Sequence, residues 1–134
     1  MKRFLLIPAV IVVLGAGVAG CAGFRTERQG RDVGRAICDI KQADNADQAQ
    51  RALDKFNRHA QKAQRIVGRP LSEDVQDIQN NLNDLVTHAT QGNDALAQQD
   101  IAVISRNVNT VSKQGPELVK RFYQGVSEGL GDCI

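Results

Sequence analysis

The sequence predicts an all-α fold, a small antiparallel bundle of four main helices preceded by a short first helix. Apolar residues recur every three or four positions through nearly all of the chain after residue 30, which is typical of helices with one buried face. Short breaks rich in glycine and proline separate these segments and favour helices that fold back on their neighbours. After residue 45 no stretch has the alternating or continuously apolar pattern of a β-strand, so no sheet is expected.

The first two helices are expected at about 31–42 and 47–67. Branched apolar residues share one face of the first, and the polar residues 44–47 offer a turn and an N-cap for the second. The second helix has a continuous apolar stripe and ends at residues 68–70, where glycine and proline occur. Its stripe consists of Ala49, Leu53, Phe56, Ala60, Ala63 and Val67.

The third helix is expected at about 73–91, with Ser72 as its N-cap and Gly92 just after its end. The fourth is expected at about 94–114, and Asp100 marks either a second start or a kink within it. Their apolar stripes are Val75, Ile78, Leu82, Leu85 and Ala89 in the third helix, and Ala97, Ile101, Ile104, Val108 and Val111 in the fourth.

The last helix is expected at about 116–130, with Pro116 at its first position, where the N–H that proline lacks is not needed. Its stripe consists of Val119, Phe122, Val126 and Leu130. Every stripe is too narrow for a helix that is buried on all sides, so the helices are expected to pack against one another.

The first 20 residues have the anatomy of a signal peptide. Met1-Lys2-Arg3 is a short positive segment, residues 4–14 are apolar with one interruption at Pro8, and residues 15–20 are small or apolar. The apolar stretch is short for a membrane span, which needs about 20 residues.

The segment Val18-Ala19-Gly20-Cys21 resembles the lipobox of small bacterial lipoproteins, with Val18 where leucine is usual. The resemblance implies cleavage after Gly20, a thioether-linked diacylglycerol on Cys21 and acylation of the new N-terminal amine. It therefore implies an exported protein, anchored by Cys21 to the outer face of the cell membrane or in the periplasm.

On this interpretation the chain has three parts. Residues 1–20 are the signal peptide, residues 21–30 are a lipidated flexible tether, and residues 31–134 form the helical bundle domain. An ordinary secretory signal and an uncleaved anchor are the alternatives for the N-terminal segment.

The same segment admits a second interpretation, because Gly15, Gly17 and Gly20 form a G-x-G-x-x-G and Asp39 follows 19 residues after Gly20. In a dinucleotide-binding domain these glycines would approach the pyrophosphate and the acidic residue would bind the ribose. That function requires a strand before the glycines, a helix after them and a parallel sheet, and the pattern of this chain predicts none of these. No cofactor is therefore expected.

Three cysteines are present, at positions 21, 38 and 133. If Cys21 carries lipid, Cys38 and Cys133 remain as an even pair in an exported protein, which favours one disulfide. Buried free thiols, or a metal or redox pair, are the alternatives, although the sequence contains no C-x-x-C motif.

Charge and composition exclude other classes of partner. Removal of residues 1–20 leaves 15 basic and 15 acidic residues, so no basic field attracts nucleic acid and no polybasic patch is expected to bind an anionic membrane. Aromatic residues are few and tryptophan is absent, which argues against stacking on bases or sugars.

Residues with catalytic or ligating chemistry are sparse. His59 and His88 could meet across the second and third helices and bind a metal together with Asp84, but the sequence lacks a His-x-x-x-His pair or a third strong ligand. Asp74 and Asp77 could form a paired-carboxylate site, but interaction with the dipole at the start of the third helix explains them more simply. We expect no enzymatic activity and no metal.

The expected function is that of a lipid-anchored structural or protein-interaction component of the cell envelope. Its partners are then the membrane, through the lipid anchor, and an envelope protein that the sequence does not identify, with no role for nucleic acid. The alternative is a carrier of a lipid or small apolar ligand between the helices, where small residues would leave room. Those residues are Ala60, Ala63, Ala89 and Ala97.

Overall fold

The computed structural model describes the backbone of residues 2–133 and the side chains of residues 21–68 and 71–133. Within these residues the chain is a compact helical bundle without strands, as the apolar periodicity predicts. The elements are α1 (Lys2–Lys41), α2 (Ala46–Val67), α3 (Arg69–Thr90), α4 (Asp94–Val111), α5 (Glu117–Leu130) and the short 3-10 helix η1 (Gly131–Cys133).

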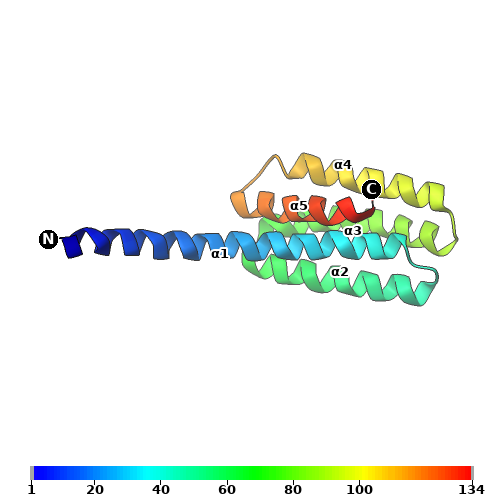
Figure 1. The fold of residues 1–134 in the computed structure, drawn as a ribbon. Coiled ribbons are helices and arrows are strands. Elements are labelled where there is room, and N and C mark those ends of the chain that lie inside the picture. Colours follow the sequence, from blue (N-terminus) through cyan, green and yellow to red (C-terminus); the bar gives the residue numbers. More distant parts are fainter. Residues whose placement is uncertain (1, 134) are drawn as a thin grey trace.

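Helix α1 is the central element of the bundle and is much longer than the sequence suggests. Its C-terminal half packs chiefly against α5 and α2, while its N-terminal half extends beyond the other helices (Figure 1). The prediction of a flexible tether at 21–30 and a separate short helix at 31–42 is therefore wrong, because both segments belong to one continuous helix.

The physical reason lies in the small residues of the expected tether. Gly23, Thr26 and Gly30 are buried on one face of α1. The hydroxyl of Thr26 donates to the carbonyl oxygen of Ala22 at 2.8 Å, so this polar side chain is satisfied within the helix. Glycine costs a helix about 1 kcal/mol relative to alanine, and packing against α5 offsets that cost here.

Two Gly-x-x-x-Gly pairs, one on each helix, bring the backbones of α1 and α5 into contact. A Cβ atom added to any of these four glycines would overlap a backbone atom of the other helix. Gly30 lies beside Phe122 and Gly34 beside Val126, so α1 and α5 run in the same direction. The four residues are Gly30, Gly34, Gly125 and Gly129.

Three helix boundaries differ from the expected ones. Helix α3 begins at Arg69 instead of about 73, because Gly68 adopts φ +89° and turns the chain within one residue, which places Ser72 inside the helix. Helix α4 ends at Val111 instead of 114. Pro116 is the N-cap of α5 and not its first helical residue.

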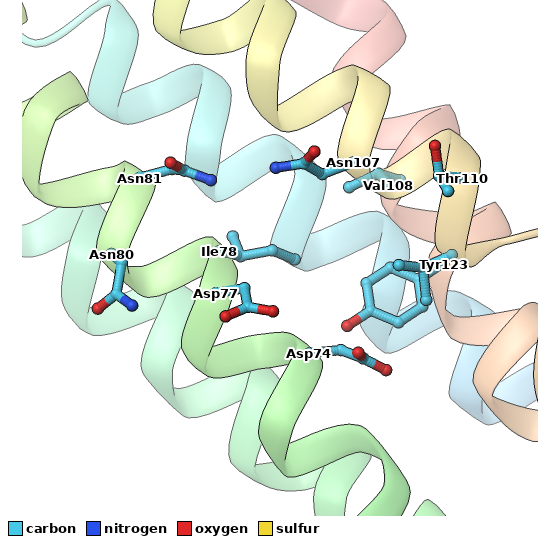
Figure 2. Close-up of a pocket in the computed structure, with 10 residues that line it drawn as sticks. Asp74, Asp77, Ile78, Asn80, Asn81, Asn107, Val108, Thr110 and Tyr123 are labelled. Atoms are coloured by element: carbon cyan, nitrogen blue, oxygen red, sulfur yellow. The ribbon is translucent and has the colours of Figure 1, made fainter.

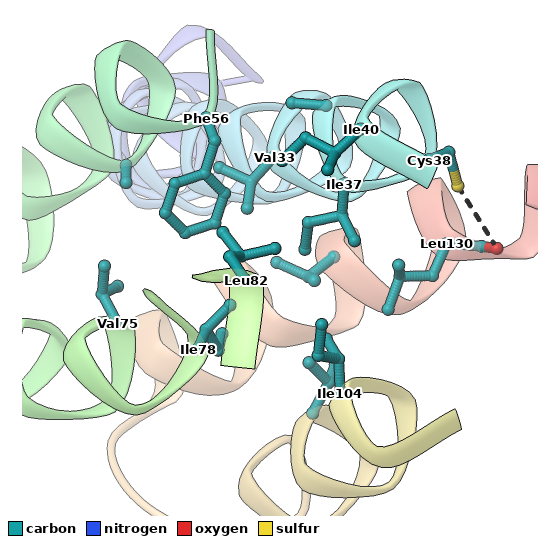
Figure 3. Close-up of a cluster of buried hydrophobic side chains, with 14 of the residues drawn as sticks. Val33, Ile37, Cys38, Ile40, Phe56, Val75, Ile78, Leu82, Ile104 and Leu130 are labelled. Atoms are coloured by element: carbon teal, nitrogen blue, oxygen red, sulfur yellow. Dashed lines mark hydrogen bonds between the residues drawn. The ribbon is translucent and has the colours of Figure 1, made fainter. Parts of the chain in front are cut away.

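The core is formed by the stripes that the sequence predicts (Figure 3). All their members are buried, except that Leu53, Val67 and Val111 are partly buried against the core. Additional core residues come from positions outside the stripes, among them Leu71 in the first turn of α3 and Tyr123 in α5. The sequence pattern therefore identified the inward faces of the helices but not every residue on them.

A disulfide joins α1 to the C-terminal end of the chain. Cys38 and Cys133 are bonded, with their Cα atoms 5.6 Å apart, which confirms the predicted pairing. Cys38 lies at the edge of the core beside Leu130 (Figure 3). The Lys41 ammonium donates to the carbonyl oxygen of Cys133 at 3.2 Å and adds a second contact between the same two segments.

Candidate functional site

The predicted lipidation site, Cys21, lies on α1 with an exposed side chain and a free thiol. The predicted signal peptide at 1–20 lies outside the residues whose side chains are described. No helix within the described residues has a segment both long and apolar enough to cross a membrane.

The end of the bundle nearest Cys21 is basic, and we call it the basic end. It is built from residues 21–28 of α1, residues 62–73 around the α2–α3 connection and residues 112–121 before and within α5 (Figure 1). These segments contain eight basic and three acidic residues. Two of the acidic residues, Glu27 and Glu117, pair with Arg121 at 3.5 and 3.2 Å.

The other end of the bundle has the opposite charge. It comprises residues 39–48, 88–97 and 128–133, which contain one basic and six acidic residues. Residues 21–134 contain equal numbers of basic and acidic residues, but the two kinds are concentrated at opposite ends of the bundle. The even balance in composition does not show this separation, because composition counts charges without recording at which end the fold places them.

The two candidate histidines have separate partners. His59 on α2 lies between helices, with Nδ1 at 2.8 Å from the Gln29 side-chain oxygen and 3.7 Å from the Asp32 carboxylate. Burial lowers the pKa of His59, and the cations Lys62, Arg58 and Lys55 lower it further against the opposing effect of Asp32. A neutral imidazole is therefore favoured at this position.

His88 on α3 pairs instead with α4. Its Nδ1 lies 2.6 Å from a carboxylate oxygen of Asp100, so this pair joins α3 to α4, and α4 continues through Asp100 without a second start. Asp84 is exposed and contacts neither histidine by an ion pair or hydrogen bond. Among the residues whose side chains are described, no group of three potential ligands is positioned to hold a metal.

The lowered pKa of His59 predicts a specific pH dependence of stability. The folded protein binds a proton on His59 less tightly than the unfolded chain does, in which the histidine pKa is about 6.5. The free energy of unfolding therefore falls as the pH drops below 6.5. His59→Gln should remove this loss, which we expect to be below about 1 kcal/mol because the site is partly solvated. Urea midpoints of both proteins at pH 5, 6 and 7 measure it, and parallel pH profiles would contradict the prediction.

A pocket of about 450 Å³ opens between α3, α4 and α5 (Figure 2). Polar and apolar side chains line it in about equal measure, and Asp74 and Asp77 belong to its lining on α3. Tyr123 lines it from α5. The full lining is Asp74, Asp77, Ile78, Asn80, Asn81, Asn107, Val108, Thr110, Val111 and Tyr123.

Tyr123 is an unusual component of this wall. Its side chain is 99% buried, since only 1% of its surface is exposed, and its hydroxyl has no hydrogen-bond partner. A buried polar group without a partner costs about 1–3 kcal/mol, so an orphaned hydroxyl calls for an explanation. Burial, followed by the negative charges of Asp74 and Asp77, raises the pKa of Tyr123 and keeps the hydroxyl protonated.

The explanation of Asp74 and Asp77 by the helix dipole does not hold. Because α3 begins at Arg69, the two carboxylates lie in its second and third turns, and its first turn contains no acidic residue. The dipole effect is confined to the first turn. Burial raises the pKa of Asp74, with further contributions from Asp77 and Glu73, so the folded chain disfavours its negative charge.

The sequence offered part of this pocket. The sequence showed that the carboxylates of Asp74 and Asp77 are three residues apart. It did not indicate Tyr123, because that residue is next to Phe122, which the apolar pattern assigns to the core. None of the four alanines expected to leave room for an apolar ligand lines this pocket. Ala60, Ala63 and Ala97 lie in the packed core, and Ala89 lines a separate pocket of about 520 Å³.

No protein-family model matches the chain, and neither the curated proteins nor the solved structures compared with it give a match.

Proposed function

We propose that the protein is exported, anchored to a membrane by lipid on Cys21, and acts as a structural or interaction component of the cell envelope. The observation that carries the proposal is the continuity of α1, which runs from Cys21 directly into the core of the bundle. Cleavage after Gly20 would place the lipid on the first residue of this helix. The bundle would then rest on the membrane and not hang from a flexible tether.

The basic end supports this placement. Lys or Arg near an anionic membrane surface contributes about 1 kcal/mol each, and the basic end has an excess of five positive charges. Phe24 lies one turn beyond Cys21 with 63% of its surface exposed, which suits an apolar side chain that enters the lipid interface. The acidic end would then face away from the membrane, toward an envelope partner.

The disulfide supports export. Disulfides persist in oxidising compartments and are rare in the cytosol, where thiols are kept reduced. Cys38 and Cys133 are bonded while Cys21 is free and exposed. This division of the three cysteines is the one that an exported protein with a lipidated cysteine requires.

Acyl labelling in cells tests the anchor. A radiolabelled or alkyne-labelled fatty acid should be incorporated into the wild-type protein and into the control variant with Cys38→Ser and Cys133→Ser. Cys21→Ala should carry no label and should leave the membrane fraction, because its thiol is the acceptor. Labelling of Cys21→Ala at the wild-type level would refute the proposed anchor.

A further inference from the structure

We propose that the pocket between α3, α4 and α5 binds a small organic cation with a primary ammonium group, held by Asp74, Asp77 and Tyr123. Nothing in the proposed anchoring function requires this pocket, so the two proposals stand on different residues. The pocket volume of about 450 Å³ lies within the range of about 300–1,000 Å³ that is usual for small-molecule sites.

The donor count of an ammonium group fits the three side chains. An ammonium group has three N–H donors, and the pocket offers two carboxylates and one phenolic oxygen as acceptors. Asp74 and Asp77 on α3 line the same pocket as Tyr123 on α5, and the Asp77 carboxylate points toward the tyrosine (Figure 2). A cation there would relieve the repulsion between the two carboxylates and supply the partner that the hydroxyl lacks.

The rest of the pocket favours an organic cation over a metal ion. Ile78 and Val108 form an apolar surface for an alkyl segment, and the amide of Asn107 faces that of Asn81 across the opening (Figure 2). Calcium takes six to eight oxygen ligands and magnesium demands a near-ideal octahedron. The described side chains hold no cluster of three carboxylate, histidine or cysteine ligands to begin such a shell.

Putrescine is a suitable probe, with 1,4-butanediol as the uncharged molecule of the same length. Tyr123 is the only tyrosine and tryptophan is absent, so intrinsic tyrosine fluorescence reports on this pocket alone. We expect putrescine to change the fluorescence of the full chain saturably and butanediol to leave it unchanged. An equal response to both molecules, or a response to calcium chloride and not to putrescine, would overturn the proposal.

Variants assign the binding to the named side chains, with calorimetry as the common readout. Asp74→Asn and Asp77→Asn should each weaken putrescine binding about tenfold or more, because each removes a charge-assisted hydrogen bond. Asp84→Asn is the matched control, since Asp84 is exposed on the same helix outside the pocket. Unchanged affinity in both pocket variants would refute the site.

Stability separates a binding role from a structural one. The pKa of Asp74 is raised in the folded state, so ionisation of Asp74 lowers the free energy of unfolding as the pH rises above 3.8, the pKa in the unfolded chain. Asp74→Asn should therefore be as stable as the wild type, or more stable, at pH 7. Tyr123→Phe removes an orphaned hydroxyl and should also keep the fold while weakening binding. Loss of stability in both variants would show that the cluster is structural and would contradict the proposal.

Discussion

Alanine at Gly30 is expected to destabilise the bundle by about 3 kcal/mol, although alanine is the better helix former. The added Cβ atom would overlap the backbone carbonyl of Phe122. A carbonyl group within a helix cannot rotate away as a side chain can, so α1 and α5 must separate along their length. The separation would open the packing around Val126, which is fully buried between them.

Urea denaturation followed by circular dichroism measures this effect. Gly125→Ala, on the opposite face of the same contact, should cost a similar amount because its Cβ would overlap the carbonyl of Glu27. Gly23→Ala is the matched control on α1, since its Cβ would lie 3.9 Å from Arg121 Nε, an ordinary contact. That control should gain up to about 1 kcal/mol from helix propensity. Equal stability of Gly23→Ala and Gly30→Ala would show that the helices are not in backbone contact.

Loss of the disulfide is expected to cost about 4 kcal/mol. The bond joins residues 95 positions apart, so it closes a loop that includes nearly the whole bundle. In the chain-entropy model a loop of this length restricts the unfolded chain by about 4–5 kcal/mol. Contacts of α1 with α5 remain in the reduced protein, so we expect it to stay folded at 25 °C with a lower urea midpoint.

The measurement compares the wild-type protein with and without reductant and with the variant carrying Cys38→Ser and Cys133→Ser. Reductant should lower the midpoint of the wild type to that of the double variant and should not affect the variant itself. Cys21→Ser is the control, because Cys21 is exposed and unbonded, and its midpoint should stay at the wild-type value. A double variant as stable as the oxidised wild type would contradict the prediction.

The number of helices and their inward faces were predictable because both depend on local chemistry. An apolar residue at every third or fourth position leaves a helix only one stable orientation, with that face inward. Ile37, Phe56, Leu82 and Ile104 are accordingly all fully buried. The cysteine pairing was predictable for a different reason, since the two cysteines that remain when Cys21 is the expected lipid acceptor allow only one connectivity.

The beginnings of α1 and α3 could not be predicted in the same way. From the sequence, Gly30 suggests that a helix is interrupted, because glycine destabilises a helix locally. The stabilising backbone contact of Gly30 with α5 exists only in the folded protein. The start of α3 depends on the positive φ of Gly68, which sequence alone does not reveal. That shift of about one turn changed the meaning of Asp74 and Asp77 from dipole partners to pocket walls.

The sequence by itself determined the helical class, the buried stripes and the Cys38–Cys133 pair. The first two depend on neighbouring residues, and the third follows because two cysteines remain when Cys21 is set aside. Only the tertiary structure decided which distant residues meet. It placed α5 against α1, sorted a balanced set of charges into a basic and an acidic end, and brought Tyr123 to Asp74 and Asp77. The physical reason is that proximity across helices depends on packing, while periodicity and composition record only what lies along the chain.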